Sequence, residues 1–320
     1  MINPSFLFDA TSQNLFFTKN DALDPRLGEF ATSQDLNSSL IYAGDYCVVG
    51  YADDEGIKLN GGRPGSHEAP KFIRQFLYKM TPALHSAKNV RICDFGDISL
   101  NQSLDQRHQM ARQSIHFLHR HGAKVISLGG GHDYGYSDAC GFIDNYLHTN
   151  YKPLIINFDA HLDVRPNLNG NNSGTPFYRM LNEFKDQVSF VEIGLQPQCN
   201  SMHHYNWALQ HGAQLFDLRW VENKGLMSLL NEKIFRDLPA QTPTLISFDI
   251  DALTSSEAGG CSQSWSTGLK IQECLRFLSA LYKRCTPCGI GIYEVSPPFD
   301  RDFQTSKTAA LLAHHFIYES

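Results

Sequence analysis

The chain has 320 residues, of which 42% are hydrophobic, 12% aromatic and 19% charged, and these proportions are typical of a soluble globular protein with a large core. The 27 Lys and Arg residues against 33 Asp and Glu residues give a formal net charge of −6, with histidine counted as neutral. Neutralising phosphates requires clustered cations, and the sequence has no block of Lys and Arg. We therefore expect a small-molecule substrate as partner, with no nucleic acid and no membrane.

No apolar segment approaches the roughly 18 residues that cross a bilayer, and the start Met1–Pro4 lacks the features of a signal peptide, so we predict a cytoplasmic protein. The eight cysteines are scattered along the chain, and reduced thiols are therefore expected. Cys285 and Cys288 form a single CxxC motif without the second pair that a four-cysteine zinc site needs. We expect two half-buried thiols before a strand, with a redox role as the alternative.

Residues 1–40 are polar and form an N-terminal extension, after which short apolar runs alternate with longer amphipathic stretches. This alternation predicts an α/β protein with a parallel sheet, and continuously apolar runs indicate strands covered by helices on both faces. The predicted strands, in chain order, are 45–51, 90–95, 124–128, 153–158, 188–194, 213–216, 244–249 and 289–294. The predicted helices are 67–82, 103–121, 134–147, 201–211, 222–236, 270–284 and 304–318. No linker interrupts the pattern, so residues 1–320 are expected to form a single domain.

Unusual polar residues follow three of the predicted strands, at the sheet edge where parallel α/β proteins bind ligands. After 124–128 come three glycines and His132, and the glycines permit a tight turn that brings the imidazole to this edge. Taken alone, a turn with a hydrogen-bonded histidine explains this motif equally well. The other two strands lead into acidic residues.

Asp159, His161 and Asp163 alternate directly after a buried strand, and alternate side chains of an extended chain share one side. Carboxylates avoid burial unless they are paired or bound to metal, so these three side chains indicate a metal site. Asp249 and Asp251 repeat this spacing at the end of another strand. Their like charges would repel unless a cation lay between them.

The predicted metal ligands are four carboxylates and two imidazoles: His132, Asp159, His161, Asp163, Asp249 and Asp251. Oxygen donors with some nitrogen and no thiolate favour manganese or another borderline divalent ion over structural zinc. Six side chains exceed the needs of one catalytic ion with open positions. If two of the carboxylates bridge, the set fills two ion sites about 3.5 to 4 Å apart, an arrangement that activates a shared water.

The sequence resembles the ureohydrolase superfamily, which includes arginase, agmatinase and formimidoylglutamase. The resemblance runs from Asn60 to the end of the chain and is carried by GGGHD (129–133), NFDAHLDVRP (157–166), SFDIDAL (247–253) and YEVSPPFD (293–300). It implies a three-layer αβα fold around an eight-stranded parallel sheet, a binuclear manganese site at the carboxyl edge of that sheet, and a homo-oligomer, either a trimer or a hexamer.

Carried over residue by residue, the resemblance implies that Asp159 and Asp249 bridge the two ions. One ion would also be held by His132 and Asp163, and the other by His161 and Asp251. Water made acidic by the ions would then attack the carbon of an amidine or guanidine. Glu294 matches the family carboxylate that pairs with the cationic carbon–nitrogen group of the substrate, and it joins Asp159 and His161 as a predicted catalytic residue.

Three further segments resemble formimidoylglutamase within the superfamily. The stretch 173–177 (SGTPF) lacks the proton-shuttling histidine of arginase-like and agmatinase-like members. The segment 60–65 (NGGRPG) resembles the NxGRxGA pattern of the subgroup, and 194–200 resembles GIQxxSN. The loop 258–263 (AGGCSQ), followed by Trp265, departs from the usual APGVSA, so the substrate tail could differ.

We therefore predict hydrolysis of N-formimino-L-glutamate to L-glutamate and formamide, a step of histidine degradation. Guanidine hydrolysis of the arginase, agmatinase or guanidinobutyrase type is the alternative. A non-catalytic family member would be expected to lose a ligand, and a zinc deacetylase would use one metal with a smaller Asp/His set. An acidic substrate tail needs cations or amide donors, for which the candidates are Arg63, Arg165, Arg179 and Asn200, although each could be an ordinary ion-paired surface residue.

Several histidines are not expected to bind metal. In the predicted helix 103–121 they fall around several faces without a carboxylate set beside them, and we expect His108, His116, His119 and His121 to lie on the helix surface. The adjacent pairs 203–204 and 314–315 point apart in a helix or a strand, and the same interpretation applies to them.

Overall fold

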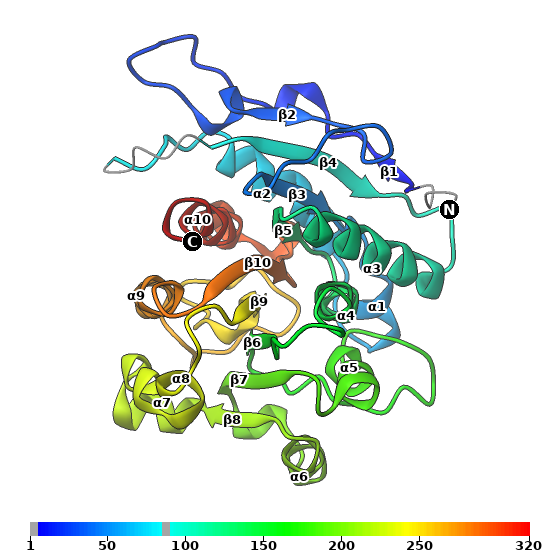
Figure 1. The fold of residues 1–320 in the computed structure, drawn as a ribbon, viewed down its shortest axis with the longest axis vertical. Coiled ribbons are helices and arrows are strands. Elements are labelled where there is room, and N and C mark those ends of the chain that lie inside the picture. The colour runs from blue at the N-terminus through cyan, green and yellow to red at the C-terminus, as the bar shows by residue number, and fades with distance from the viewer. Residues whose placement is uncertain (1–5, 85–89) are drawn as a thin grey trace.

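The central sheet of this protein contains all eight strands that the sequence predicts. The computed structural model describes residues 6–84 and 90–320. The eight strands run parallel in the order β4-β3-β5-β10-β9-β6-β7-β8, with helices on both faces (Figure 1). They span β3 (Tyr46–Gly50), β4 (Ile92–Ile98), β5 (Lys124–Leu128), β6 (Leu154–Phe158), β7 (Ser189–Leu195), β8 (Gln214–Asp217), β9 (Pro243–Asp249) and β10 (Thr286–Tyr293). The predicted three-layer αβα fold is confirmed.

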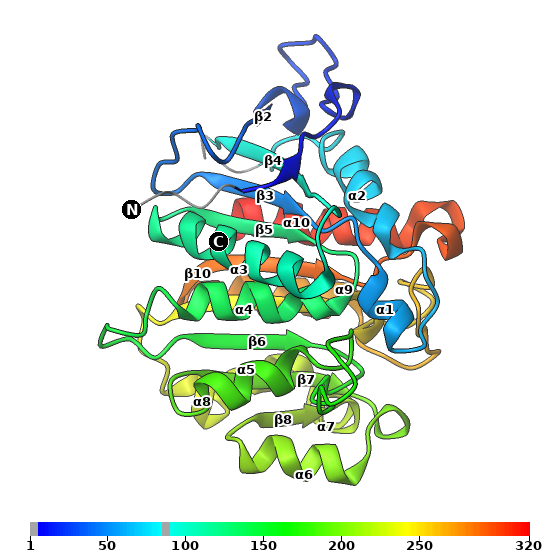
Figure 2. The same cartoon turned by 90° about the vertical axis from the view of Figure 1, so that its right-hand side faces the viewer.

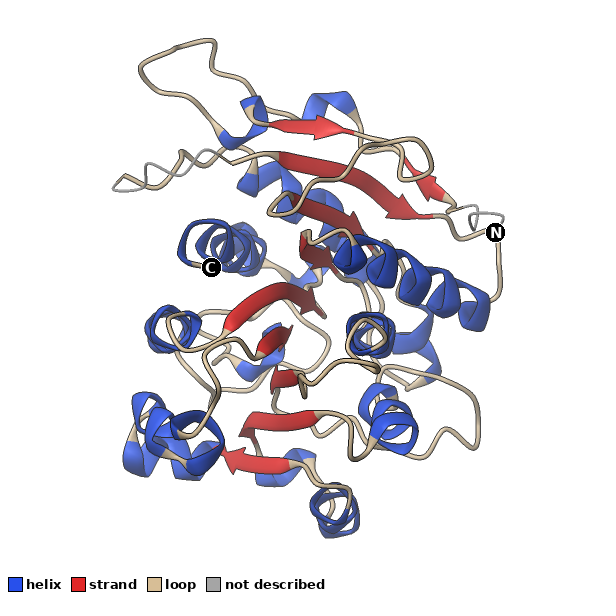
Figure 3. Cartoon of the chain, in the orientation of Figure 1, coloured by secondary structure: helices blue, strands red, loops and turns tan. Residues whose placement is uncertain are grey.

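Helices cover the two faces of the sheet and bury its apolar side chains (Figures 1 and 3). One face carries α3 (Leu104–Arg120), α4 (Gly135–Ile143), α5 (Pro176–Phe184) and α6 (Met202–Gln210). The other carries α2 (Ala69–Leu77), α7 (Leu218–Lys224), α8 (Lys233–Arg236), α9 (Ile271–Tyr282) and α10 (Gln304–Glu319). The short helix α1 (Glu55–Leu59) follows β3 and lies at the carboxyl edge, toward which the arrowheads point in Figure 2.

Two short strands from the first 40 residues extend the sheet beyond the eight that were predicted. β1 (Phe8–Asp9) pairs antiparallel with the end of β4, and β2 (Ala31–Ser33) pairs parallel with its start. Both therefore hydrogen-bond to the outer side of β4. Unpaired strand edges invite association with other chains, and these short strands cover that edge.

The helices differ from the prediction at three places. The predicted helix 222–236 is split into α7, a 3₁₀ segment (Leu226–Asn231) and α8, because Gly225 adopts a φ of 80° that a continuous helix cannot contain. The structure also contains α1 and α5, which were not predicted. In α5 the residues Phe177, Met180, Leu181 and Phe184 are buried at helical spacing, so the periodicity was present in the sequence.

The prediction that the α3 histidines lie on the surface is wrong for two of the four. His108 is fully buried and His119 is 8% exposed, because α3 packs against both the sheet and α4. Burial lowers the pKa of His119 to about 3, so this imidazole stays neutral. Within the described ranges, no helix is both long and apolar enough to cross a membrane.

Candidate metal centre

The residues that follow β5, β6 and β9 meet at the carboxyl edge of the sheet. In the sheet, β10 lies between β5 and β9, and β6 borders β9. The register aligns Phe158 at the end of β6 with Phe248 of β9, and their buried rings stack with centroids 5.0 Å apart. Because these strands end at the same level of the sheet, the polar side chains that follow them lie close together.

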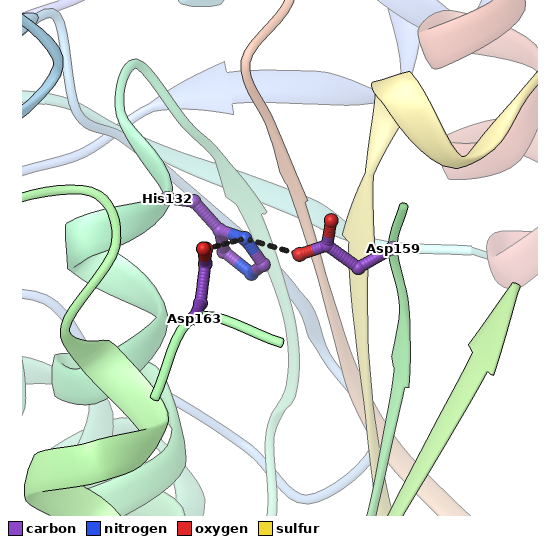
Figure 4. A group of neighbouring side chains, drawn as sticks. All are labelled: His132, Asp159 and Asp163. Carbon is purple, nitrogen blue, oxygen red and sulfur yellow. Dashed lines mark ion pairs between the residues drawn. The ribbon is translucent and has the colours of Figure 1, made fainter. Parts of the chain in front are cut away.

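The imidazole of His132 lies against three carboxylates. Figure 4 shows two of them, Asp159 and Asp163, on either side of the ring. Its Nδ1 is 3.0 Å from Oδ2 of Asp163, 3.1 Å from Oδ2 of Asp159 and 3.3 Å from Oδ2 of Asp249. This buried Nδ1 nevertheless forms no hydrogen bond. An imidazole nitrogen and three carboxylate oxygens directed at one point, without hydrogen bonds among them, fit a divalent cation.

A second group adjoins the first and shares Asp159 with it. His161 Nδ1 is 3.1 Å from Oδ2 of Asp251 and 3.4 Å from Oδ1 of Asp159. Asp159 thus presents one oxygen to each imidazole, as a bridging carboxylate must. Asp249 contacts only the first of these imidazoles, and its role as a second bridge stays a prediction. Oδ1 of each bridging candidate also accepts a backbone N–H, from His161 for Asp159 and from Asp251 for Asp249.

Burial and mutual repulsion shift the pKa of most acidic groups in this cluster. Burial, together with the charges of Asp251 and Asp159, raises the pKa of Asp249 well above its usual value. Burial also raises the pKa values of Asp163 and Asp251, again with a contribution from the charge of Asp159. Burial acts to raise the pKa of Asp159 too, but its close contacts with the two histidines outweigh burial and lower that pKa. Carboxyl groups with raised pKa values hold protons, and divalent cations that bind to the cluster would displace these protons.

The two imidazoles have raised pKa values for the corresponding reason. Burial disfavours the charged imidazolium of His132, but its contacts with the surrounding carboxylates outweigh burial and raise the pKa well above the usual value. In His161, burial is outweighed mainly by the charge of Asp251. Both effects express the excess of negative charge at this edge of the sheet.

Two residues of the centre adopt a left-handed backbone that side chains disfavour. Asp163 has a φ of 48° and Glu294 a φ of 65°. The strain costs about 1 to 3 kcal/mol per residue and persists only where the surrounding structure enforces it. The carbonyl of Asp163 accepts the N–H of Phe177 at 3.1 Å, and the N–H of Glu294 donates to the carbonyl of Gly130 at 2.9 Å. These bonds hold both carboxylates toward the cavity.

Glu294 contacts the first group of the centre through the backbone of His132. Its Oε1 accepts the backbone N–H of His132 at 3.0 Å, and the residue is 6% exposed. Burial raises its pKa to about 8, although the bond from His132 acts in the opposite direction. Positive charge beside this carboxylate would favour its ionised form.

The cavity over the centre has a volume of about 260 Å³. The residues that line it from the centre are His161, Asp163, Asp249, Asp251 and Glu294. The others come from α1, from the 3₁₀ segment Pro197–Cys199 and from loops: Ile57, Asn60, Gly62, Arg165, Ser173, Gln198, Cys199, Ser262, Gln263 and Trp265. A second cavity of about 540 Å³ shares part of this lining, including Arg165 and Cys199, and extends to His204 of α6.

Polar residues inside the strands orient the cluster, and sequence reasoning missed them. His132 Nε2 lies 2.9 Å from Ser247 Oγ. Asn157 Nδ2 donates to Asp159 Oδ2 at 3.3 Å and to Glu192 Oε2 at 2.9 Å. Burial raises the pKa of Glu192 well above its usual value. The available signal was the polar residue that interrupts each apolar run, because such a residue is costly to bury without a partner.

Two of the four candidates for binding the substrate tail, Asn200 and Arg179, do not line the first cavity, and their side chains contact other groups of the protein. The side chain of Asn200 accepts the N–H of Leu162 at 2.8 Å and donates to the carbonyls of Ala160 at 2.8 Å and Gln196 at 2.9 Å. These bonds hold the loop 159–163, which carries three of the predicted ligands. Arg179 Nη1 lies 3.2 Å from His108 Nδ1, and its guanidinium covers the ring of Tyr136 at 3.5 Å.

Arg63 and Arg165 take different places. Arg63 bonds to the backbone of a neighbouring loop and is absent from the residues that line the first cavity. Arg165 lines both cavities, where its Nη1 donates to Asn60 Oδ1 at 3.1 Å. Of the four candidates, Arg165 is the one that lines the first cavity, and Asn200 joins it in the lining of the second.

Two other features of the sequence, the histidine His108 and the CxxC motif, do not line the cavity. His108 Nε2 is 2.6 Å from Asp133 Oδ2, so this helix histidine pairs with the residue next to His132. Cys285 is buried before β10, Cys288 is partly buried within it, and both thiols are free. They belong to the start of the strand, at the opposite edge from the centre.

A family model described as the Arginase family matches residues 45–318, which is most of the chain. This chain belongs to the arginase family. Among curated relatives of this arginase-family chain, formimidoylglutamase of Streptococcus gordonii is 28% identical over 291 residues, which cover 88% of this chain and 86% of the relative.

Two solved structures are similar over nearly the whole arginase-family chain. The Trypanosoma cruzi formiminoglutamase with Mn²⁺ gives a TM-score of 0.80 at 27% identity and covers 92% of this chain and 98% of its own. The Bacillus subtilis formimidoylglutamase gives a TM-score of 0.81 at 25% identity, with 94% and 93% covered.

Proposed function

We propose that the protein is a binuclear manganese hydrolase that converts N-formimino-L-glutamate to L-glutamate and formamide. The observation that carries the proposal is the paired cluster of imidazoles and carboxylates around Asp159, whose first group includes an orphaned His132 Nδ1. The substrate is supported by the formimidoylglutamases that resemble this chain, one of which has been solved with Mn²⁺.

In this proposal the six predicted ligands hold two Mn²⁺ ions. His132, Asp163 and Asp249 would serve one ion, His161 and Asp251 the other, and Asp159 both, with Asp249 as the second bridge that the family resemblance implies. When bound, the pair supplies an acidified water as nucleophile and positive charge that stabilises an anionic transition state. Asn157 and Ser247 would keep Asp159 and His132 in the orientation that binding requires.

The residues of the cavity would bind and orient the substrate. Glu294 uses Oε1 to accept the N–H of His132, which leaves its second carboxylate oxygen to pair with the amidinium group. This pairing would fix the electrophilic carbon over the centre, and ordering of this kind lowers the entropic part of the barrier. Arg165 would face a carboxylate of the glutamate tail with a charge-assisted hydrogen bond.

Guanidine hydrolysis, the alternative, is not favoured by the relatives or by the cavity. The relatives and solved structures cited above are formimidoylglutamases. The segment 173–177 has no histidine for proton shuttling, and it contributes Ser173 to the cavity while Phe177 packs in the core. As parts of the same proposal, residues 1–320 act as one catalytic domain with 1–40 as an extension, in a cytoplasmic homo-oligomer.

The proposal is tested by incubating the manganese-loaded protein with formiminoglutamate, arginine, agmatine and guanidinobutyrate. Formamide, ammonia and urea are measured separately. Formamide and glutamate from formiminoglutamate alone would support the proposal. Urea from any of the guanidines, with no formamide, would replace it with the alternative, and one zinc per chain would indicate a deacetylase-like centre.

A further inference from the structure

One wall of the cavity is a segment outside the metal-ligand loops. Residues 260–265, here called the wall segment, contribute Ser262, Gln263 and Trp265 to the cavity lining. Trp265 is 37% exposed, so it stands at the opening of the cavity. The wall segment overlaps the loop 258–263, whose sequence departs from the pattern usual in the formimidoylglutamase subgroup, and its position bears on which substrate tail fits.

One side of the wall segment is attached to the residues that follow Glu294. The N–H of Ser296 donates to the carbonyl of Gly260 at 2.7 Å, and Cys261 pairs antiparallel with Val295. The far end is tied by a bond from the N–H of Ser255 to the carbonyl of Trp265 at 2.7 Å. These contacts involve Gly260, Cys261 and Trp265, and Ser262 between them is held by a different residue.

Arg63 supplies that second attachment. Its Nε donates to the carbonyl of Ser262 at 3.0 Å, its Nη2 to the carbonyl of Cys261 at 2.9 Å, and its backbone N–H to Ser262 Oγ at 2.8 Å. The guanidinium carbon lies 4.2 Å from the centroid of the Phe299 ring. A planar fork that serves two carbonyls and stacks on a ring is a geometry that lysine cannot reproduce.

The charge of Arg63 is directed at protein groups. Within residues 6–84 and 90–320, Arg63 forms no ion pair with a carboxylate. Ser262 also lies close to the backbone of Gly62, since a Cβ added at Gly62 would lie 2.8 Å from Ser262 Oγ. Arg63 therefore belongs to a tight contact between two loops.

We propose that Arg63 is a positioning residue for substrate specificity, which acts by holding the wall segment so that Gln263 and Trp265 fit the tail of an acidic amidine. The identity of that substrate rests on the proposed function. The role differs from direct contact with the substrate, which the sequence suggested for Arg63, because the donors of the guanidinium are directed at the wall segment.

Substitution of Arg63 separates binding from chemistry. Arg63→Met keeps an apolar stem against Phe299 but loses both side-chain bonds to the wall segment, and we expect KM for formiminoglutamate to rise about tenfold. The kcat and the manganese content should stay near those of the parent, because the metal ligands are untouched. Arg63→Lys should resemble Arg63→Met, because one ammonium group cannot serve both carbonyls in this geometry.

Trp265 reports the position of the wall segment without any substrate. The chain has three tryptophans, and a background with Trp207→Phe and Trp220→Phe leaves Trp265 as the only one. In this background, Arg63→Met should shift the emission to longer wavelength and increase quenching by acrylamide. Unchanged emission and quenching would overturn the proposal, and this result would not depend on whether formiminoglutamate is the substrate.

A double-mutant cycle distinguishes positioning from direct contact. If Arg63 acts through the wall segment, Arg63→Met should add little to the rise in KM that Trp265→Ala already causes, because coupled residues are not additive. Additive effects would overturn the proposal. If the parent does not hydrolyse formiminoglutamate, the proposed function fails, while the fluorescence result still decides the role of Arg63.

Arg91 provides the matched control. Its Nη2 also donates to a backbone carbonyl, that of Leu40 at 3.3 Å, and its guanidinium lies 5.0 Å from the ring of Tyr42. Unlike Arg63, it also forms an ion pair, through Nη1 with Asp45 at 2.7 Å, so its loss is at least as large a change for the fold. It precedes β4 at the amino edge of the sheet, away from the cavity. Arg91→Met should therefore leave KM and the Trp265 signal unchanged, and a change equal to that of Arg63→Met would overturn the specific role.

Discussion

Replacing Asn200 should weaken both the fold and manganese binding, because its side chain anchors the loop that carries His161 and Asp163. The amide makes three hydrogen bonds to backbone groups, one with Leu162, one with Ala160 and one with Gln196. Asn200→Ala removes all three, and Leu162, which is 2% exposed, is left with an N–H that has lost its acceptor. At about 1 kcal/mol net per bond, the expected loss in the free energy of unfolding is about 3 kcal/mol.

The affinity for manganese should fall in parallel. Residues that orient metal ligands typically contribute about 10- to 100-fold to metal affinity. We expect Asn200→Ala to weaken Mn²⁺ binding within this range, as measured by titration of metal-free protein. Urea unfolding of the metal-free protein gives the stability change separately from any effect of the metal.

Asn200→Asp is the matched variant that sharpens this test. It keeps an oxygen that accepts the N–H of Leu162. The side-chain NH₂ group, which donates to the carbonyls of Ala160 and Gln196, is replaced by a carboxylate oxygen that these carbonyls repel. It should therefore be no more stable than Asn200→Ala near pH 7. If Asn200→Ala instead kept its stability and metal affinity and changed only KM, the reasoning would be refuted, and Asn200 would be a direct substrate contact.

Three further predictions concern the metal centre. Asp159→Ala should lose both manganese ions, whereas Asp163→Ala and Asp251→Ala should each lose mainly one; metal analysis showing equal losses in all three would contradict a shared Asp159. Glu294→Gln should keep its metal content and raise KM for the amidine by about tenfold, since one charged contact is lost; steady-state kinetics identical to wild type would exclude the pairing. The thermal stability of the metal-free protein should fall as pH rises from about 5 to about 8. In the folded state the pKa of Glu294 is raised to about 8, so its carboxyl keeps its proton over this range, whereas in the unfolded state it loses that proton from about pH 4.5 upward. Because the folded state binds more protons here, rising pH favours the unfolded state. Raised pKa values of the two ligand histidines act in the same direction, so a melting temperature that is flat across this range would contradict these shifts.

Much of the fold was predictable from the order of apolar runs. Each of the eight predicted strands lies in the sheet, because a strand covered on both faces must be apolar along its whole length. The two edge strands were missed because β1 and β2 have two and three residues, too few to show a pattern. The division of helix 222–236 was missed because periodicity does not reveal that Gly225 takes a positive φ.

The sequence by itself determined which chemistry the chain carries to the carboxyl edge. Asp159 directly follows β6, Asp249 ends β9, and His132 follows β5 after three glycines. The carboxyl ends of parallel strands lie at one edge of a sheet, so the arrival of these residues at that edge follows from local sequence, whereas the strand order brings them together. Their roles as ligands and catalytic groups stay predictions. Arg63 and Asn200 show the limit of this reasoning, because the sequence suggests them as substrate contacts but does not reveal their hydrogen bonds to distant backbone groups. Their contact with a substrate stays a prediction.

Only the tertiary structure decided where those polar side chains point. Arg63 meets a loop about 200 residues away along the chain, and His108 is buried against Asp133 by the packing of α3 on its neighbours. Hydrogen-bond partners of this kind come from segments distant in sequence, and satisfying a buried polar group depends on the whole packed arrangement. Local patterns therefore fix which residues reach the site, whereas packing fixes which of them face the substrate and which hold the site together.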